Sequence, residues 1–136
     1  MPSDPRSLGI LLISGEHGRA HYAFVVATGA AALGRRVTLF ATNAGCHALL
    51  ADWSGLGDAG RDAVIVARGV AGLDVLREAA SELDIRMIAC EAWLRGEGLE
   101  RAVLSPGVEI AGVATFLAAV GDGQFISLNR SRRALT

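Results

Sequence analysis

The chain of 136 residues contains no lysine, only two cysteines and no long hydrophobic run. All 13 basic side chains are arginine and the formal net charge is −1, so the chain has no overall positive field that would attract nucleic acid. No apolar run reaches the roughly 18 residues that a membrane-spanning helix needs. The N-terminal residues 1–7 are polar and lack the apolar core of a signal peptide. We therefore expect neither nucleic acid nor membrane as a partner.

The two cysteines, Cys46 and Cys90, lie far apart in the sequence and do not form a disulfide framework, so a reducing cytoplasm is the expected compartment. Trp93 stands where a second cysteine would complete a C-x-x-C motif, which excludes a thioredoxin-type dithiol. The glycine-bearing turn "GEHGR" lacks the G-x-G-x-x-G pattern, and a P-loop needs a lysine. We expect no cofactor.

The composition is that of one globular domain, with 51% hydrophobic and 20% charged residues. Its length allows a sizeable core, which we place within residues 8–128 of a single domain covering residues 1–136. The remaining residues, 129–136, have no apolar periodicity and are expected to form a flexible tail.

Hydrophobic patterning predicts strands that alternate with helices. A helical stripe is formed by Tyr22, Val25, Val26, Gly29, Ala30 and Leu33, and Gly34 is suited to end that helix. Residues 42–60 read as a loop with a helical turn, and residues 63–67 as either a strand or the start of a helix. The other predicted elements are strands at 8–14, 37–41, 85–89 and 124–128, a short extended piece within 105–112, and helices from 73 to about 83, from about 91 to 101 with a break near Gly96 and Gly98, and from 113 to 120.

Such alternation of near-continuous apolar strands with helices indicates a parallel sheet covered on both faces. In these sheets, ligands and reactive groups gather beyond the carboxyl ends of the strands. That rule selects the turn at 14–19, the loop at 42–47 and the segment that begins at Cys90.

Cys90 follows a predicted strand and precedes a predicted helix. The unpaired N–H groups and the positive dipole at a helix N-terminus favour the reactive thiolate. The neighbouring carboxylate of Glu91 favours the neutral thiol instead. Without other information, Cys90 is either a reactive thiol or a small buried apolar side chain.

Cys46 is a candidate second thiol, with His47 beside it in the sequence. Adjacent side chains usually point in different directions, so the spacing does not make His47 the base of Cys46. The alternative is a loop cysteine without a role. A disulfide between Cys46 and Cys90 would require Cα atoms within roughly 7 Å of each other.

The candidates to line a pocket near Cys90 are His17, His47, Arg68, Glu91 and Trp93, and His21 is a further histidine that could do so. His17 and His21 have helical i, i+4 spacing, but no acid or cysteine completes a metal site, and we expect no metal. Arg68 could face an anionic sulfur species, and Trp93 could cover the thiol. Each of these residues also has an ordinary structural explanation. The histidines could cap the start of a helix, Arg68 could be a solvated surface arginine, and Trp93 could be an aromatic that packs in the fold.

Three stretches, "RAHYAFVVATGAAALGRRVTLF", "LDIRMIACEAWLRGEGL" and "GVEIAGVATFLAAVGDGQFISL", occur in an order and spacing that resembles the DsrE/DsrF-like family of sulfur-relay proteins. The resemblance covers about residues 8–128. It implies an α/β fold, a three-layer α/β/α arrangement with a mostly parallel sheet of about five strands. It also implies a persulfide on Cys90 and assembly into homo-oligomers, from dimers to hexamers. The chain departs from many relatives at Glu91, where they carry glycine, and from some at Trp93, where they carry cysteine.

The sequence therefore predicts a sulfur carrier or sulfurtransferase-like protein that takes sulfur from a persulfide or sulfane-sulfur donor onto Cys90. It would then pass that sulfur to the thiol of an acceptor partner by the same exchange. Attack of Cys46 on a loaded Cys90 would instead release sulfide and leave a disulfide. The alternative from another class is a non-catalytic oligomeric module that binds a small ligand or a protein and whose cysteine is buried and inert.

Overall fold

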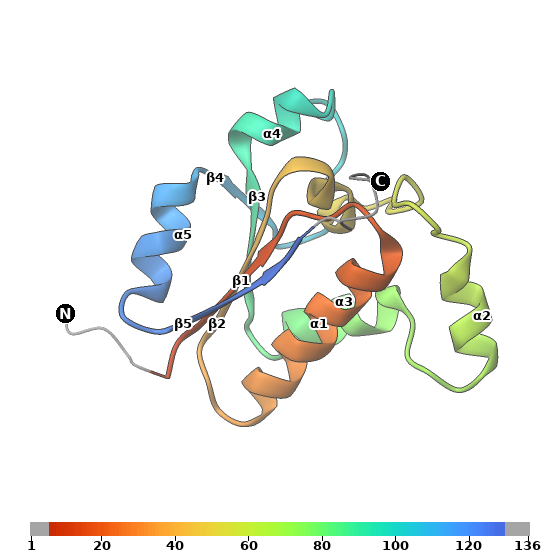
Figure 1. The fold of residues 1–136 in the computed structure, drawn as a ribbon, viewed down its shortest axis with the longest axis horizontal. Helices are drawn as coiled ribbons and strands as arrows, with labels where there is room; N and C mark the ends of the chain where they lie inside the picture. Colours follow the sequence, from red (N-terminus) through yellow and green to blue (C-terminus); the bar gives the residue numbers. More distant parts are fainter. Residues whose placement is uncertain (1–5, 130–136) are drawn as a thin grey trace, which may run out of the picture.

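The computed structural model, which describes residues 6–129, contains a five-stranded sheet with helices on both faces (Figure 1). The strand order is β4-β3-β2-β1-β5 and every neighbouring pair is parallel. The predicted α/β class and sheet of about five strands are confirmed. In chain order the elements are β1 (Leu8–Leu12), α1 (His17–Ala32), β2 (Val37–Ala41), the 3₁₀ helix η1 (Asn43–Leu49), α2 (Arg61–Ala67), α3 (Leu73–Glu82), β3 (Arg86–Cys90), α4 (Glu91–Gly96), β4 (Glu109–Ala111), α5 (Val113–Val120) and β5 (Gln124–Leu128).

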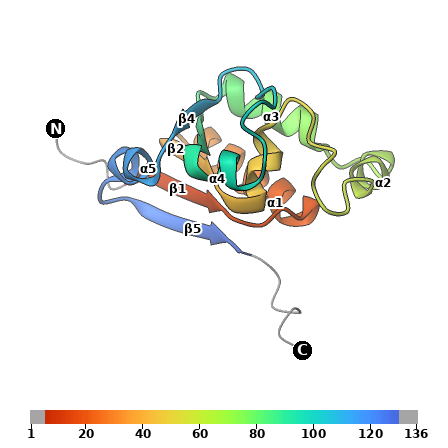
Figure 2. The same cartoon turned by 90° about the horizontal axis from the view of Figure 1, so that it is seen from above.

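The central strands are apolar throughout because both faces of the sheet are covered. All five residues of β2 are buried. Helix α1 packs on β1 and β2 with α3 beside it, and α5 covers β1 and β2 from the opposite face (Figures 1 and 2). Helix α5 approaches closely at Gly9, where an added Cβ would lie 2.5 Å from Val120. On that face the ring of Phe116 stacks on Phe40 at a centroid distance of 5.1 Å and meets Phe125 edge-on at 5.7 Å.

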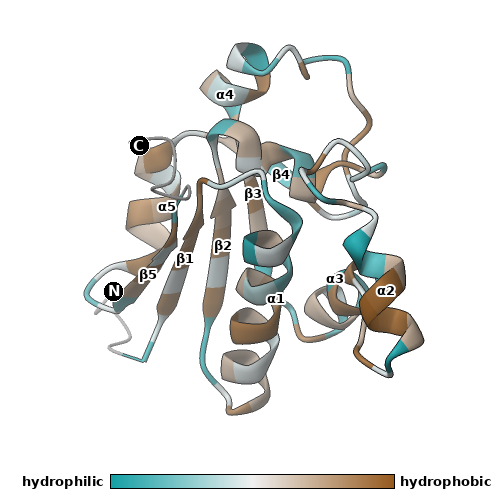
Figure 3. Ribbon diagram, turned by 45° about the vertical axis from the view of Figure 1, so that its right-hand side comes forward, coloured by the Kyte–Doolittle hydropathy of each residue, from teal (hydrophilic) through white to brown (hydrophobic). Residues whose placement is uncertain are grey.

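The parallel arrangement places every strand's carboxyl end at the same edge of the sheet. Strands β2 and β3 are neighbours, with Ala41 opposite Ala89. The segments that follow them, η1 and α4, therefore lie in contact at this edge, in the upper part of Figure 3. This adjacency brings together two loops that are more than forty positions apart in the sequence.

The structure corrects the predicted buried face of α1. The residues that face the core are His17, Ala20, Ala23, Phe24, Ala27 and Ala30, whereas Tyr22 and Leu33 of the predicted stripe are 57% and 78% exposed. Both sides of this helix carry apolar residues, so hydropathy did not distinguish the packed side. Small alanines allow the helix to lie close to the sheet.

Helix α4 ends at Gly96, where the sequence predicts a break, but, contrary to expectation, no helix resumes between there and Arg101. Gly98 adopts a left-handed conformation with φ of +71°, and the N–H of Leu99 donates to the carbonyl of Leu94 at 2.6 Å. This is the hydrogen bonding by which a glycine ends a helix. Residues 63–67, left open between strand and helix, belong to α2. Within the predicted tail, 129–136, residues 130–136 lie outside the described part of the chain.

Within residues 6–129, no helix has both the length and the apolar character needed to cross a membrane. Helix α2 nevertheless carries apolar residues, shown in brown at the edge of the molecule in Figure 3. None of its residues is buried.

Candidate functional site

Cys90 is the last residue of β3 and the N-cap of α4, as its predicted place between strand and helix requires. The residue is buried, with 7% of its surface exposed. Its backbone is extended, and its side chain makes no capping hydrogen bond to α4. We expected the N–H groups of this helix to stabilise the Cys90 sulfur, but they make no direct hydrogen bond to it in this conformation.

Cys46 lies in η1 and is completely buried. Its thiol donates to the carbonyl oxygen of Ala41 at 3.6 Å. Burial raises the pKa of the Cys46 thiol to about 12, and negative charge on Cys90 or on the Glu97 carboxylate acts in the same direction. A hydrogen bond from the backbone of Cys90 acts in the opposite direction. Cys46 is therefore a neutral thiol at physiological pH.

These interactions place the two cysteines next to each other, and both are free thiols. The pairing follows from the adjacency of β2 and β3, whose carboxyl ends lead into η1 and α4. Both residues are buried, Cys90 with 7% of its surface exposed and Cys46 with none. Cys90 is therefore the less deeply buried of the two in this conformation.

His47 and Glu97 lie beside the cysteine pair. The His47 Nε2 atom is 3.8 Å from Glu97 Oε1, and both side chains are about one-quarter exposed. The imidazole also packs against Gly55, where an added Cβ would lie 2.5 Å from His47 Nδ1. Sequence reasoning missed Glu97, although its place seven residues after Cys90, two helical turns on, was a usable signal.

Glu91 and Trp93 lie on the outer side of α4. The Glu91 side chain is 61% exposed and forms an ion pair with Arg95 at 3.5 Å. Trp93 is 40% exposed, and its ring lies against Gly96, where an added Cβ would be 2.6 Å from the indole. The side chains of Glu91 and Trp93, at which the chain departs from relatives, thus face solvent or their own helix.

The remaining candidates have other partners. His17 is buried and donates from Nε2 to Asp62 Oδ1 at 2.7 Å, while its Nδ1 has no partner. His21 donates to the carbonyl of Ala71 at 2.8 Å. Arg68 is the C-cap of α2, which lies well apart from α4 (Figures 1 and 2). Over residues 6–129, no group of three potential metal-ligating side chains is present.

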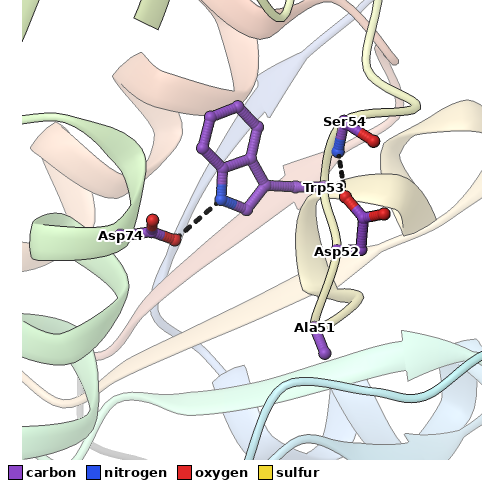
Figure 4. A pocket seen from close by; sticks show the side chains of 5 residues that line it. All are labelled: Ala51, Asp52, Trp53, Ser54 and Asp74. Carbon is purple, nitrogen blue, oxygen red and sulfur yellow. Dashed lines mark hydrogen bonds between the residues drawn. The ribbon is translucent and has the colours of Figure 1, made fainter. Parts of the chain in front are cut away.

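A pocket of about 340 Å³ lies away from the cysteines, between α3 and the loop after η1 (Figure 4). It is lined by Ala51, Asp52, Trp53, Ser54 and Asp74. The indole N–H of Trp53 donates to Asp74 Oδ1 at 2.8 Å, and this bond ties the loop to the start of α3.

The chain was compared with known proteins, and no family model matches it. It is 27% identical to the sulfur carrier protein DsrE2 of Allochromatium vinosum, with 88% of this chain and 95% of the relative covered. It is 26% identical to the uncharacterised protein YrkE of Bacillus subtilis, with 90% and 96% covered.

Two solved structures have a similar fold. The ychN protein from E. coli matches with a TM-score of 0.61 at 14% identity and covers 89% of this chain and 98% of its own. MTH1491 from Methanobacterium thermoautotrophicum, a protein of unknown function, matches with a TM-score of 0.58 at 16% identity and covers 89% and 97%. The fold and the similarity to a sulfur carrier along nearly the whole chain confirm the resemblance to the DsrE/DsrF-like family that the sequence predicts.

Proposed function

We propose that this protein is a sulfur carrier that holds sulfur as a persulfide on Cys90 and transfers it to the thiol of a partner protein in the cytoplasm. The observation that carries the proposal is the pairing of two free cysteines at the carboxyl edge of the sheet, of which Cys90 is the less deeply buried. The similarity to a sulfur carrier supports the same chemistry.

Loading begins when the Cys90 thiolate attacks the terminal sulfur of a donor persulfide, R–S–SH. A bond forms between Cys90 Sγ and that sulfur, the S–S bond of the donor breaks, and the donor leaves as a thiolate that takes up a proton. Transfer repeats the exchange, with the acceptor thiolate attacking the terminal sulfur and Cys90 leaving. No external oxidant or reductant is needed, because each step moves one sulfur atom between thiols.

Intact-mass measurement after incubation with glutathione persulfide tests the proposal. The wild-type protein and the Cys46→Ser variant should each gain one sulfur, about 32 Da, and Cys90→Ser should gain none. A wild-type protein that gains no sulfur, or a Cys90→Ser variant that gains as much as the wild type, would refute it.

The burial of Cys90 favours the second candidate function, an oligomeric binding module with an inert cysteine. The same mass measurement distinguishes the two functions, because an inert cysteine takes up no sulfur while the protein stays folded. Circular dichroism of the incubated sample establishes that the fold is intact when the mass is read.

We also propose that the protein assembles with copies of itself through the α5–β5 face, defined by Val113, Leu117 and Phe125. These side chains are 54%, 52% and 47% exposed, and α5 contains no charged residue. Apolar patches of this kind are typical of protein contacts. Light scattering should show an oligomer for the wild type and a monomer for Leu117→Glu, while Leu33→Glu, at an exposed site on α1, should not change the mass. A monomeric wild type would contradict this assembly.

A further inference from the structure

The segment that carries Cys46 is fixed to the fold on both sides of the cysteine. On the N-terminal side, the N–H of Gly45 donates to the carbonyls of Ile13 and Thr42 at 3.1 and 2.9 Å. A Cβ added at Gly45 would lie 2.3 Å from the carbonyl oxygen of Leu12. Only glycine therefore allows η1 to lie this close to the end of β1.

On the C-terminal side, the segment is held by Arg77 of α3. Its guanidinium donates to the carbonyl oxygens of Ala48 at 3.1 Å, Leu50 and Ala51 at 3.3 Å. These carbonyls belong to the end of η1 and the residues after it, where backbone acceptors lack helical partners. The Arg77 side chain is only 11% exposed, and its Nε has no partner.

The burial of this arginine is costly, which indicates that its contacts matter for the segment it binds. Its carboxylate partner, Asp74, is 3.8 Å away and 78% exposed. Burial lowers the pKa of Arg77, and Asp74 opposes that change without cancelling it. The buried guanidinium is thus held by hydrogen bonds to the carbonyls of the Cys46 segment in addition to its charge interaction with Asp74. An arginine exposed to solvent would not hold the carbonyls at the end of η1 in this way.

We propose that Arg77 is a positioning residue that keeps Cys46 enclosed beside Cys90 by holding the carbonyls that follow it. The proposal rests on the assignment of Cys90 and Cys46 as the paired thiols of the carrier. Without the three hydrogen bonds, η1 stays anchored at Gly45 but becomes free to move at its other end. Cys46 then loses both its burial and its fixed approach to Cys90.

Two measurements on Arg77→Met, Arg77→Lys and a control, Arg86→Met, test the inference. Arg86 lies at the far end of β3 from Cys90 and makes a bidentate ion pair with Glu109, so its loss also removes hydrogen bonds but not near the cysteines. The first measurement is the alkylation rate of Cys46 in a Cys90→Ser background under native conditions. The second is the equilibrium between the Cys46–Cys90 disulfide and glutathione.

In Arg77→Met, Cys46 should be alkylated at least about tenfold faster, because the thiol becomes exposed. Its disulfide should be about tenfold less favoured, equivalent to roughly 30 mV for this two-electron couple. Arg77→Lys, which keeps one donor group, should restore part of both effects, and Arg86→Met should match the parent protein. Urea unfolding of each variant establishes that the measurements are made on folded protein.

An Arg77→Met variant that matches Arg86→Met in either measurement would overturn the inference. So would a wild-type protein that forms no disulfide at any glutathione ratio, because the proposed approach of the two thiols would then not exist. Failure of the carrier function is distinguishable: Cys90 would then take up no sulfur from glutathione persulfide, while the Arg77 effects on Cys46 alkylation would remain.

Discussion

The titration of Cys46 is the sharpest quantitative consequence of the structure. Burial raises the pKa of this thiol from 9.0 to about 12, which reduces its thiolate fraction at neutral pH by about a thousandfold relative to an ordinary thiol. Alkylating reagents attack the thiolate and also need access, and Cys46 is fully buried. In a Cys90→Ser variant, where Cys46 is the remaining thiol, the Coulombic contribution of Cys90 is lost but burial remains. Iodoacetamide should therefore react at pH 8 at least about a hundredfold more slowly than with a small free thiol.

The pH dependence of that rate tests the cause. Burial is the largest contribution to the shift and survives the loss of Cys90, so the rate should still be rising above pH 10. Replacing Glu97 by Gln removes a negative charge beside Cys46 and should raise the rate by about twofold to tenfold. Glu91→Gln is the matched control, since that carboxylate is exposed and paired with Arg95. Reaction of Cys46 at pH 7 with the speed of a free thiol would refute this reasoning.

Three further predictions concern stability measured by urea unfolding. Between pH 9 and 12 the unfolded chain loses the Cys46 proton while the folded chain keeps it. The free energy of unfolding should therefore fall with rising pH by up to about 4 kcal/mol relative to Cys46→Ala. Parallel pH profiles of the two proteins would count against the raised pKa. Phe116→Ala should lower the free energy of unfolding by about 3–5 kcal/mol, because its ring is 2% exposed between the sheet and α5, and a loss below 1 kcal/mol would contradict that packing. Gly29→Ala should stabilise the protein by about 0.5–1 kcal/mol, since nothing lies near an added Cβ in α1. Gly45→Ala should lower the free energy of unfolding by about 1–3 kcal/mol or more, because its Cβ would meet the carbonyl of Leu12. Equal effects of the two variants would contradict the close approach at Gly45.

Most strands and helices could be predicted from the sequence because each carries a local signal. The run "VTLFA" has the bounds of β2, and the left-handed Gly34 follows α1 as expected. The packed face of α1 could not be predicted in this way. Tyr22 and Phe24 are both apolar and only two positions apart, and it is contact with the sheet that makes one exposed and the other buried.

The candidate site was predictable only in part, for a different physical reason. The parallel sheet places Cys46 and Cys90 at the same edge, but their contact depends on β2 and β3 being neighbours, which no local pattern encodes. Glu97 and Arg77 were missed because their roles depend on which carbonyls and thiols the fold brings within reach. His17 was noticed for its spacing to His21, yet its bond is to Asp62 on α2.

Under the proposed carrier function, the unequal burial of the two cysteines bears on how sulfur is retained on Cys90. Cys46 lies beside Cys90, and its thiolate would attack the Sγ of a Cys90 persulfide, expel hydrosulfide and close a disulfide. That reaction competes with transfer to a partner and would end the carrier's cycle until a reductant reopened the bond. Since Cys46 is held buried and protonated, with a pKa of about 12, the attacking form is scarce at neutral pH. A partner thiolate that reaches Cys90 therefore has the advantage over Cys46 at neutral pH, although Cys46 lies beside Cys90.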